Sequence, residues 1–249
     1  MTGISNNGEP VIRIINLHKT FENKPVLKGI SLDLYHGQNM VILGRSGAGK
    51  SVLIRCIVRL VWPDAGSINV FGEDVLRLSE QDLNELRIRV GYLFQEGALY
   101  DSMSLAENLL FPLKRNKPGL HRHEMQELIE EALESVDLTE ARDKMPAELS
   151  GGMRKRAGLA RTLILKPEII LYDEPTTGLD PYTAREINEL IVRVQEKYNA
   201  SSIVVTHDMK CARTVSNSVS IIHGGQFIAT GAFEELENHN DITVRNYFL

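Results

Sequence analysis

The residue types with the clearest chemistry form a glycine-rich segment that ends in a lysine and a serine. They match the phosphate-binding pattern G-x-x-x-x-G-K-S/T at every position, as Gly44, Arg45, Ser46, Gly47, Ala48, Gly49, Lys50 and Ser51. The apolar run 40–43 before them predicts a buried strand, and the amphipathic run 52–57 after them predicts a helix. A plain glycine turn is the alternative, and the strand–loop–helix context disfavours it.

Such a loop can hold an anion because of where its backbone donors point. A strand that turns through glycines into a helix start leaves several N–H groups unpaired and directed to one place, and the helix dipole adds to their field. We therefore expect phosphates in this loop. The Lys50 ammonium would reach the β- and γ-phosphates, and the Ser51 hydroxyl would hold Mg²⁺.

Two neighbouring carboxylates, Asp173 and Glu174, end the apolar run 169–172. Successive side chains on a strand point to opposite faces, so the two acids are expected to do different work. Asp173 would serve Mg²⁺, and Glu174 would orient or deprotonate an attacking water. Solvated acids at a turn, next to Pro175, are the alternative, which the nearby phosphate-loop pattern disfavours.

A second glycine-rich helix start lies at Ser150-Gly151-Gly152. Ser150 is a good N-cap residue, and the glycines allow backbone N–H groups to approach a ligand. One nucleotide does not need two such helix starts within one subunit. A dimer explains both if each subunit's phosphate loop is closed by the other's Ser150–Gly152. Taken alone, the segment is more simply an ordinary capped helix.

Two further polar residues follow predicted strands: Gln95 after 90–94, and His207 after 203–206. Gln95 can accept from a metal-bound water, and His207 can reach a γ-phosphate. A loop or structural role is the alternative for each. Phe21 offers a flat ring for adenine, or it is a partly buried loop aromatic.

Apolar patterning predicts an α/β fold in which strands and helices alternate. Strands are expected at 11–15, 26–34, 40–43, 67–71, 90–94, 169–172, 203–206 and 219–222. Helices are expected at 52–57, 124–136, 152–165 and 182–197. Such alternation implies a parallel sheet covered on both faces. The resulting division is a core at 1–94 and 167–238, a helical subdomain at 95–166 and a tail at 239–249.

Composition limits the partners and the compartment. A net charge of -5 argues against nucleic-acid binding through a broad basic face, and the cluster Arg154–Arg156 fits a solvated helix face. Cys56 and Cys211 fit small core residues in a reducing compartment. Residues 1–10 lack the apolar core of a signal peptide, and no apolar run approaches the ~20 residues of a membrane span. We expect a cytosolic chain unless a partner brings it to a membrane.

Together these motifs resemble the ATP-binding subunit of an ABC transporter over residues 10–235. Their order is specific: the phosphate loop, Gln95, Leu149–Gly152, Asp173 with Glu174, Gly178–Asp180, and His207. The resemblance implies an α/β P-loop NTPase (RecA-like) core. An N-terminal antiparallel β subdomain and an inserted α-helical subdomain would complete the fold.

The resemblance also implies a role for each matching residue. The cofactors would be ATP and Mg²⁺, with Phe21 stacking adenine. Phosphate contacts would come from Gly44, Arg45, Ser46, Gly47, Ala48, Gly49, Lys50, Ser51 and Val52, and from Ser150, Gly151 and Gly152 of a second copy. The metal would be served by Ser51, Gln95 and Asp173. Catalysis would rest on Glu174, His207, Lys50 and Gln95, and Asp180 would lie at the dimer seam.

One position departs from the family pattern. The commonest signature ends in glutamine, whereas this chain has Met153. Met153 has no side-chain N–H to donate, so the contribution of an amide is absent. The backbone donors and Ser150 are kept, so hydrolysis is expected to be kept as well.

A narrower resemblance is to the Mla/Mce branch of this family. It is carried by residues 47–54, 94–103, 107–108, 111–113 and 149–153. ATPases of that branch drive phospholipid trafficking between bacterial membranes, with a permease and lipid-binding MCE-domain proteins. In some members the C-terminal tail clasps the neighbouring ATPase. The tail of this chain is either too short for such a clasp or cut short in this sequence.

The sequence thus predicts a cytosolic ATPase that works as a head-to-tail homodimer on the inner face of the cell membrane. It would drive a permease through the surface around 95–112. An ATPase of a solute importer, for amino acids for example, shares the catalytic motifs and is disfavoured modestly by residues 94–113. A non-transport ABC ATPase usually has two cassettes or a long coiled-coil insert. A regulator that binds ATP without hydrolysing it is disfavoured by the presence of both Glu174 and His207.

Overall fold

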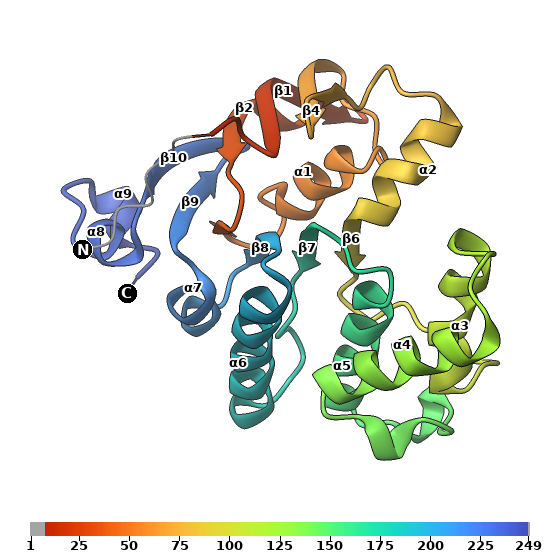
Figure 1. Cartoon of the computed structure of the whole chain (residues 1–249). Coiled ribbons are helices and arrows are strands. Elements are labelled where there is room, and N and C mark those ends of the chain that lie inside the picture. Colours follow the sequence, from red (N-terminus) through yellow and green to blue (C-terminus); the bar gives the residue numbers. More distant parts are fainter. Residues whose placement is uncertain (1–7, 249) are drawn as a thin grey trace.

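The computed structural model describes residues 8–248. The prediction that residues 1–10 contain no signal peptide falls mostly outside that range. The described part is built from two sheets and the helices that surround them (Figure 1).

The larger sheet has six strands, and its inner strands run parallel. Its order is β10 (Gln226–Gly231), β9 (Ser218–His223), β3 (Asn39–Leu43), β8 (Ser201–Thr206), β7 (Ile169–Asp173) and β6 (Val90–Leu93). β10 pairs with β9 in antiparallel fashion. Every residue of β3, β7 and β8 is buried, as expected for parallel strands covered on both faces.

Alternate side chains of these strands enter two apolar clusters, one on each face of the sheet. In β7, Ile170 and Tyr172 belong to the cluster that contains α5 (Gly151–Leu163), α6 (Pro181–Tyr198) and α7 (Met209–Val215). Ile169 and Leu171 belong to the other cluster, with α1 (Lys50–Ile57). The sheet therefore separates α1 from α6, which lie on opposite sides of it in Figure 1.

The smaller sheet is antiparallel and comes from the N-terminal part of the chain. Its order is β2 (Lys24–Leu34), β1 (Ile12–Phe21), β4 (Ala65–Val70) and β5 (Glu73–Asp74). Its inner side chains, such as Leu27 and Ile30, share one apolar cluster with Leu53 of α1. The antiparallel sheet thus covers the helix that follows the phosphate loop, and the expected N-terminal antiparallel β unit is confirmed.

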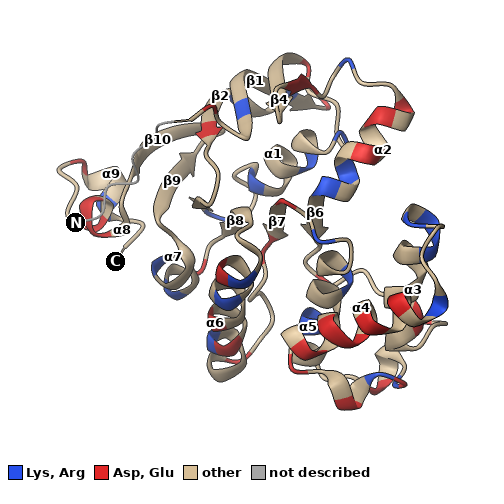
Figure 2. Ribbon diagram, viewed as in Figure 1, with Lys and Arg blue, Asp and Glu red and all other residues tan. Residues whose placement is uncertain are grey.

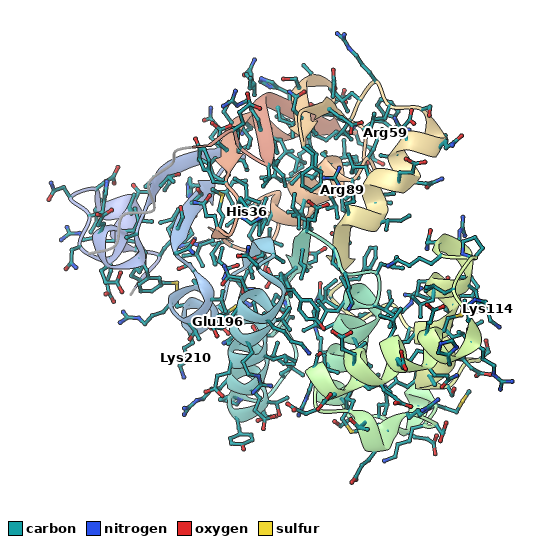
Figure 3. The ribbon with its side chains drawn as sticks, viewed as in Figure 1. His36, Arg59, Arg89, Lys114, Glu196 and Lys210 are labelled. Atoms are coloured by element: carbon teal, nitrogen blue, oxygen red, sulfur yellow. The ribbon has the colours of Figure 1, made fainter. Side chains whose placement is uncertain are left out.

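A helical stretch separates β6 from β7. It contains α3 (Leu105–Asn116), α4 (Arg122–Ser135), α5 and two 3₁₀ turns, Thr139–Ala141 and Pro146–Glu148. Ser104 and Glu107 form a capping box that starts α3. As the sequence predicts, no strand occurs in 96–166, all of which the structure describes. Lys114, near the end of α3, lies at the outer edge of this stretch (Figure 3).

Several helices and strands were not predicted from the apolar periodicity of the sequence. These are β5, β10, α2 (Glu80–Arg89), α3, α7, α8 (Phe233–Glu237) and α9 (Ile242–Arg245). In α2 the buried residues are Leu83 and Leu86 alone, so its apolar period is weak. The placement of Phe21 in a loop is wrong, because β1 continues to that residue. Register shifts in the pairing of β1 with β2 interrupt the alternation that would have revealed the longer strand.

The tail packs on its own chain. Val244 of α9 is fully buried, and the rings of Phe233 and Phe248 meet edge to face with centroids 5.2 Å apart. His223 Nδ1 and the Tyr247 hydroxyl lie 2.8 Å apart. The described part of the tail therefore covers the end of β9.

Other sequence predictions concern membrane spans, thiols and charge. In residues 8–248 no helix combines the length and apolarity needed to cross a membrane. Cys56 and Cys211 are both buried, as predicted, and burial raises the pKa of the Cys56 thiol to about 12. Figure 2 shows acidic residues along α4 and residues of both charge signs on α6.

Replacing Gly158 with alanine tests how closely α5 lies on the loop after β6. A Cβ at position 158 would stand 2.7 Å from the Cα of Gly97. Alanine favours a helix interior by ~1 kcal/mol over glycine, but the overlap costs ~1–3 kcal/mol. We expect a lower free energy of unfolding in urea. Gly119→Ala, where a Cβ meets nothing within 4 Å, is the control. A Gly158→Ala protein as stable as the original chain would show that the two segments are not closely packed.

Candidate active site

The parallel register brings the predicted site residues to one edge of the sheet. Leu43 at the end of β3 pairs with Thr206 of β8, and Asp173 of β7 pairs with Val205. The phosphate loop, Asp173–Glu174 and His207 follow directly from these strand ends. Carboxyl ends of parallel strands are where α/β sheets bind ligands.

A cavity of about 390 Å³ opens at this edge. It is lined by Val26, Ser46, Gly47, Gly49, Lys50, Ser51, Val52, Gln95, Glu174, Thr177 and His207. Residues predicted from four separate parts of the sequence are thus placed around one space. The phosphate loop, Gln95, Glu174 and His207 all contribute.

The phosphate loop has the backbone geometry of an anion cradle. Gly49, the N-cap of α1, has φ 102° in the left-handed region and supplies no side-chain cap, so the first N–H groups of α1 have no side-chain partner there. Lys50 Nζ donates back to the carbonyl oxygens of Gly44 at 2.8 Å and Arg45 at 3.3 Å. A Cβ on Gly44 would stand 2.6 Å from Ile222 Cγ2, so glycine is required there.

Asp173 is the buried carboxylate of the site. The Ser51 hydroxyl donates to its Oδ1 at 2.5 Å, and the Tyr92 hydroxyl and Arg55 guanidinium donate to its Oδ2 at 2.9 and 3.2 Å. Burial raises the pKa of Tyr92 above its ordinary value, so its phenol stays a donor. A hydrogen bond from the Arg55 guanidinium to the Tyr92 hydroxyl oxygen, together with the charge of Asp173, raises the pKa of Arg55.

Ser51 and Asp173 suit Mg²⁺ by their chemistry. Both offer hard oxygen atoms, which Mg²⁺ prefers, and they already lie in contact. No group of three or more His, Cys, Asp or Glu side chains with metal-binding placement occurs in 8–248. A small protein ligand set fits Mg²⁺, which takes its remaining ligands from phosphates and water.

Glu174 points to the other side of the strand end, toward the phosphate loop. Its Oε1 lies 3.0 Å from Lys50 Nζ. Its Oε2 accepts from the Thr177 hydroxyl at 3.1 Å and lies 2.9 Å from His207 Nδ1. The backbone of Glu174 has φ 51°, which is strained for a side-chain-bearing residue and is often found at functional sites. Asp173 and Glu174 thus have separate surroundings, as predicted, but β7 ends at Asp173, so the left-handed backbone of Glu174 sets its direction rather than strand alternation.

Within one chain, the helix start Ser150–Gly152 does not reach the phosphate-loop cavity. Ser150 caps α5 by accepting from Met153 N at 3.3 Å, and Thr183 covers Gly152. Gly151 borders a neighbouring hollow of about 560 Å³ together with Gln95, Lys155 and Thr177. Of the residues the structure describes, Ser150–Gly152 are not among those lining the cavity of the phosphate loop.

Phe21 and Asp180 lie at the margins of the site. Phe21 is 43% exposed at the end of β1, and Lys19 Nζ stands 5.0 Å from its ring centroid. Asp180 caps α6 by accepting from the Tyr182 and Thr183 backbone at 3.0 and 3.1 Å. Hydrogen bonds from Thr183 hold the pKa of Asp180 below its usual range.

Sequence reasoning missed four residues that touch the site: Arg55, Tyr92, Lys155 and Thr177. The interpretation of Arg154–Arg156 as a solvated helix face is wrong for Lys155, which is 7% exposed. Lys155 Nζ donates to the carbonyl oxygens of Gln95 and Glu174. The sequence did contain a signal for its burial, because Lys155 lies three residues after Gly152 within an apolar face of the helix.

Several known proteins are similar to this chain in sequence. The family model described as "ABC transporter" matches residues 27–177, more than half of the chain. The probable ribonucleotide transport ATP-binding protein mkl of Mycobacterium leprae is 38% identical over 95% of this chain and 68% of its own length. The methionine import ATP-binding protein MetN of Rhizobium etli is 38% identical over 90% of this chain and 61% of its own length. The chain thus spans about two thirds of the length of these curated relatives.

Solved structures agree with the sequence relatives. The dimeric ATP-binding cassette MJ0796, bound to ADP and Pi in a post-hydrolysis state, superposes with a TM-score of 0.82 at 28% identity. That match covers 89% of this chain and 98% of MJ0796. The cbiO1 protein of Clostridium perfringens, part of the ABC transporter complex cbiONQ, gives a TM-score of 0.85 at 26% identity over 97% of this chain and 96% of cbiO1. The chain therefore belongs to the ABC transporter family, has the ABC ATPase fold, and is an ATP-binding ATPase subunit.

Proposed function

We propose that this ATPase works as a head-to-tail homodimer that holds two MgATP at its seam and drives a membrane permease. One observation supports the dimer most strongly. The chain has two phosphate-type helix starts, Gly49–Lys50 and Ser150–Gly151, and only the first lines the phosphate-loop cavity among the described residues. A second copy placed head to tail supplies the missing half of each site.

ATP binding would rearrange the contacts of Lys50. Its ammonium lies between the loop carbonyls and Glu174 Oε1. A phosphate carries more charge than one carboxylate, so it draws Lys50 away from Glu174. Mg²⁺ held by Ser51 and Asp173, with Gln95 at its margin, would neutralise charge on the phosphates.

Release from Lys50 would free Glu174 for its catalytic work. Thr177 and His207 hold Oε2 and so fix the direction of the carboxylate. Oε1 then accepts the proton of the attacking water. With half of its side chain exposed, His207 is accessible to a γ-phosphate on the cavity side. Phe21 would stack the adenine, and Asp180, beside the 72% exposed Tyr182, would lie at the seam.

A groove of about 290 Å³ suits the permease. It is lined by residues of α2, β6, α3 and α5, including Tyr92, Pro112 and Thr162, and by Phe94 just after β6. Large apolar side chains stand exposed on the loop after α1, on the segment between β6 and α3, and on α3, namely Leu60, Trp62, Phe94, Tyr100 and Phe111. We place the chain on the cytoplasmic face of the cell membrane through this groove. Gln95 lines the nucleotide cavity and directly follows Phe94, which lines the groove, so docking and hydrolysis would meet at that residue.

For the cargo we propose phospholipid in traffic between membranes, with an MCE-domain lipid-binding protein as a further partner. Support comes from residues 94–113 and the Leu149–Met153 signature, which resemble the Mla/Mce branch. Import of a solute such as an amino acid is the second candidate. It is favoured by the methionine import relatives, which are 34–39% identical to this chain.

Replacing Glu174 with glutamine keeps the shape and removes the base. We expect turnover to fall by ~10²–10⁴-fold, because that is the usual contribution of a general base. ATP binding is expected to persist and to trap the closed dimer, measured by size-exclusion chromatography with MgATP. Glu134→Gln, at an exposed position on α4, is the control. Turnover retained at the wild-type rate would remove Glu174 from its assigned role.

Replacing Lys50 with alanine removes the cation of the phosphate loop. A hydrogen bond to a charged group contributes ~1.5–3 kcal/mol, so ATP affinity should fall by ~10–100-fold. Titration with a fluorescent ATP analogue measures the loss. Lys114→Ala, at the outer edge of α3, is the matched control (Figure 3). Unchanged affinity in the Lys50 variant would mean that phosphates bind elsewhere.

Co-purification of the tagged chain with its partners from native membranes tests the proposed cargo. In mild detergent we expect a permease, an MCE-domain protein and bound phospholipid in stoichiometric amounts by mass spectrometry. A permease with a soluble solute-binding protein would favour the importer instead. A dimer without any membrane partner would contradict the transport proposal.

A further inference from the structure

Lys155 is a buried cation whose ammonium is directed at two backbone carbonyls of the site. It lies on α5, just after the helix start Ser150–Gly152, and it is 7% exposed. Its Nζ donates to the carbonyl oxygen of Gln95 and, at 3.4 Å, to that of Glu174. Burying an ammonium is costly unless its donors are satisfied, so these two carbonyls are needed where they are.

The two acceptors belong to residues whose side chains line the nucleotide cavity. Glu174 has a left-handed backbone with φ 51°, a conformation that persists where surrounding contacts hold it. A donor on its carbonyl oxygen helps to fix that peptide and with it the direction of the carboxylate. Gln95 is the first residue after β6, so a donor on its carbonyl fixes where the chain leaves the sheet.

Two more contacts join α5 to the same loop. The backbones of Gly97 and Gly158 touch, since a Cβ on Gly158 would stand 2.7 Å from Gly97 Cα. The Arg161 guanidinium donates to the carbonyl oxygen of Ala98 at 2.5 Å. Positions 155, 158 and 161 are three apart and so share one face of the helix. α5, which lies against β6, and the segment 95–98 are therefore expected to move as one body (Figure 1).

We propose that Lys155 is a positioning residue that links the two ATP sites of the dimer, by tying the helix start Ser150–Gly152 to Gln95 and Glu174. The proposal rests on the head-to-tail homodimer of the proposed function. In that dimer Ser150–Gly152 meet the nucleotide held by the partner. Lys155 passes a movement of that helix start to the backbone of the residues around the chain's own nucleotide. Occupancy of one site thereby sets the geometry of the catalytic carboxylate in the other.

Lys155→Met tests this role, because methionine fills a similar volume without charge or donor. ATP titrations of hydrolysis give kcat and the Hill coefficient, and a fluorescent ATP analogue gives the affinity and the number of functional sites. We expect kcat per functional site to fall by ~10-fold or more, since small misplacements near the reacting atoms are costly. ATP affinity should stay within about twofold, because Lys155 touches no phosphate-loop residue.

Cooperativity is the readout that a purely structural role would not move. The original chain should show a Hill coefficient above one, and the methionine variant should approach one. Lys155→Arg, which keeps the donors, should recover most of both. Lys166→Met is the matched control, since Lys166 is exposed, pairs with Glu131 of α4 and precedes β7, at the opposite end of that strand from Asp173. If Lys155→Met does not fold, Lys155→Gln takes its place in the same assay.

The outcomes separate this inference from the proposed function. Wild-type kcat and Hill coefficient in Lys155→Met would overturn it, as would a loss of rate that only follows the loss of functional sites. ATP-driven dimerisation of Glu174→Gln is measured in parallel. If that variant dimerises while Lys155→Met behaves as wild type, the role of Lys155 fails alone. If that variant stays monomeric, the homodimer fails, and the link between sites fails with it.

Discussion

The contact between Lys50 and Glu174 is the interaction around which the site is organised. Both side chains are almost fully buried, and their charged atoms lie 3.0 Å apart. A buried ion pair is favourable only when further hydrogen bonds satisfy both groups. Lys50 has the carbonyl oxygens of the phosphate loop, and Glu174 has Thr177 and His207. In the mechanism we propose, an anion entering the loop competes for the same ammonium, so nucleotide binding would also release the Glu174 carboxylate.

The rest of the fold serves to keep these groups in place. The aligned ends of β3, β7 and β8 fix the separation of the phosphate loop, Asp173 and His207. The side chains on the two faces of β7 pack into two different apolar clusters, and this packing prevents the strand from rotating. The antiparallel sheet packs on α1, and Ile222 of β9 packs closely against Gly44. The helical stretch is attached through α5, whose buried Lys155 reaches the backbone of the site.

Features made of consecutive residues could be predicted from the sequence, whereas contacts between distant residues could not. The phosphate loop could be read directly, because glycines, Lys50 and Ser51 follow one another between a strand and a helix. The different surroundings of Asp173 and Glu174 were predicted from strand alternation, but the left-handed backbone of Glu174, one residue beyond β7, is what produces them. Tyr92 was not found, because its strand reads as apolar and its hydroxyl meets Asp173 only in three dimensions. Lys155 was misread, because the run of three charged residues Arg154–Arg156 suggested a solvated face. Burial there is set by the packing of α5 on the loop after β6. The homodimer and the cargo lie outside what one chain can display.

Chemical proximity between the phosphate loop of one subunit and Ser150 of another tests the central claim most directly. Chains carrying Ser46→Cys and chains carrying Ser150→Cys, both with Glu174→Gln, are mixed with MgATP and a short bis-maleimide. The native thiols, Cys56 and Cys211, are buried and stay unreactive. The account predicts a crosslink between positions 46 and 150 of different chains that requires ATP. Failure of that crosslink in an ATP-bound sample, or a link between positions 46 and 150 inside one chain, would contradict the composite site.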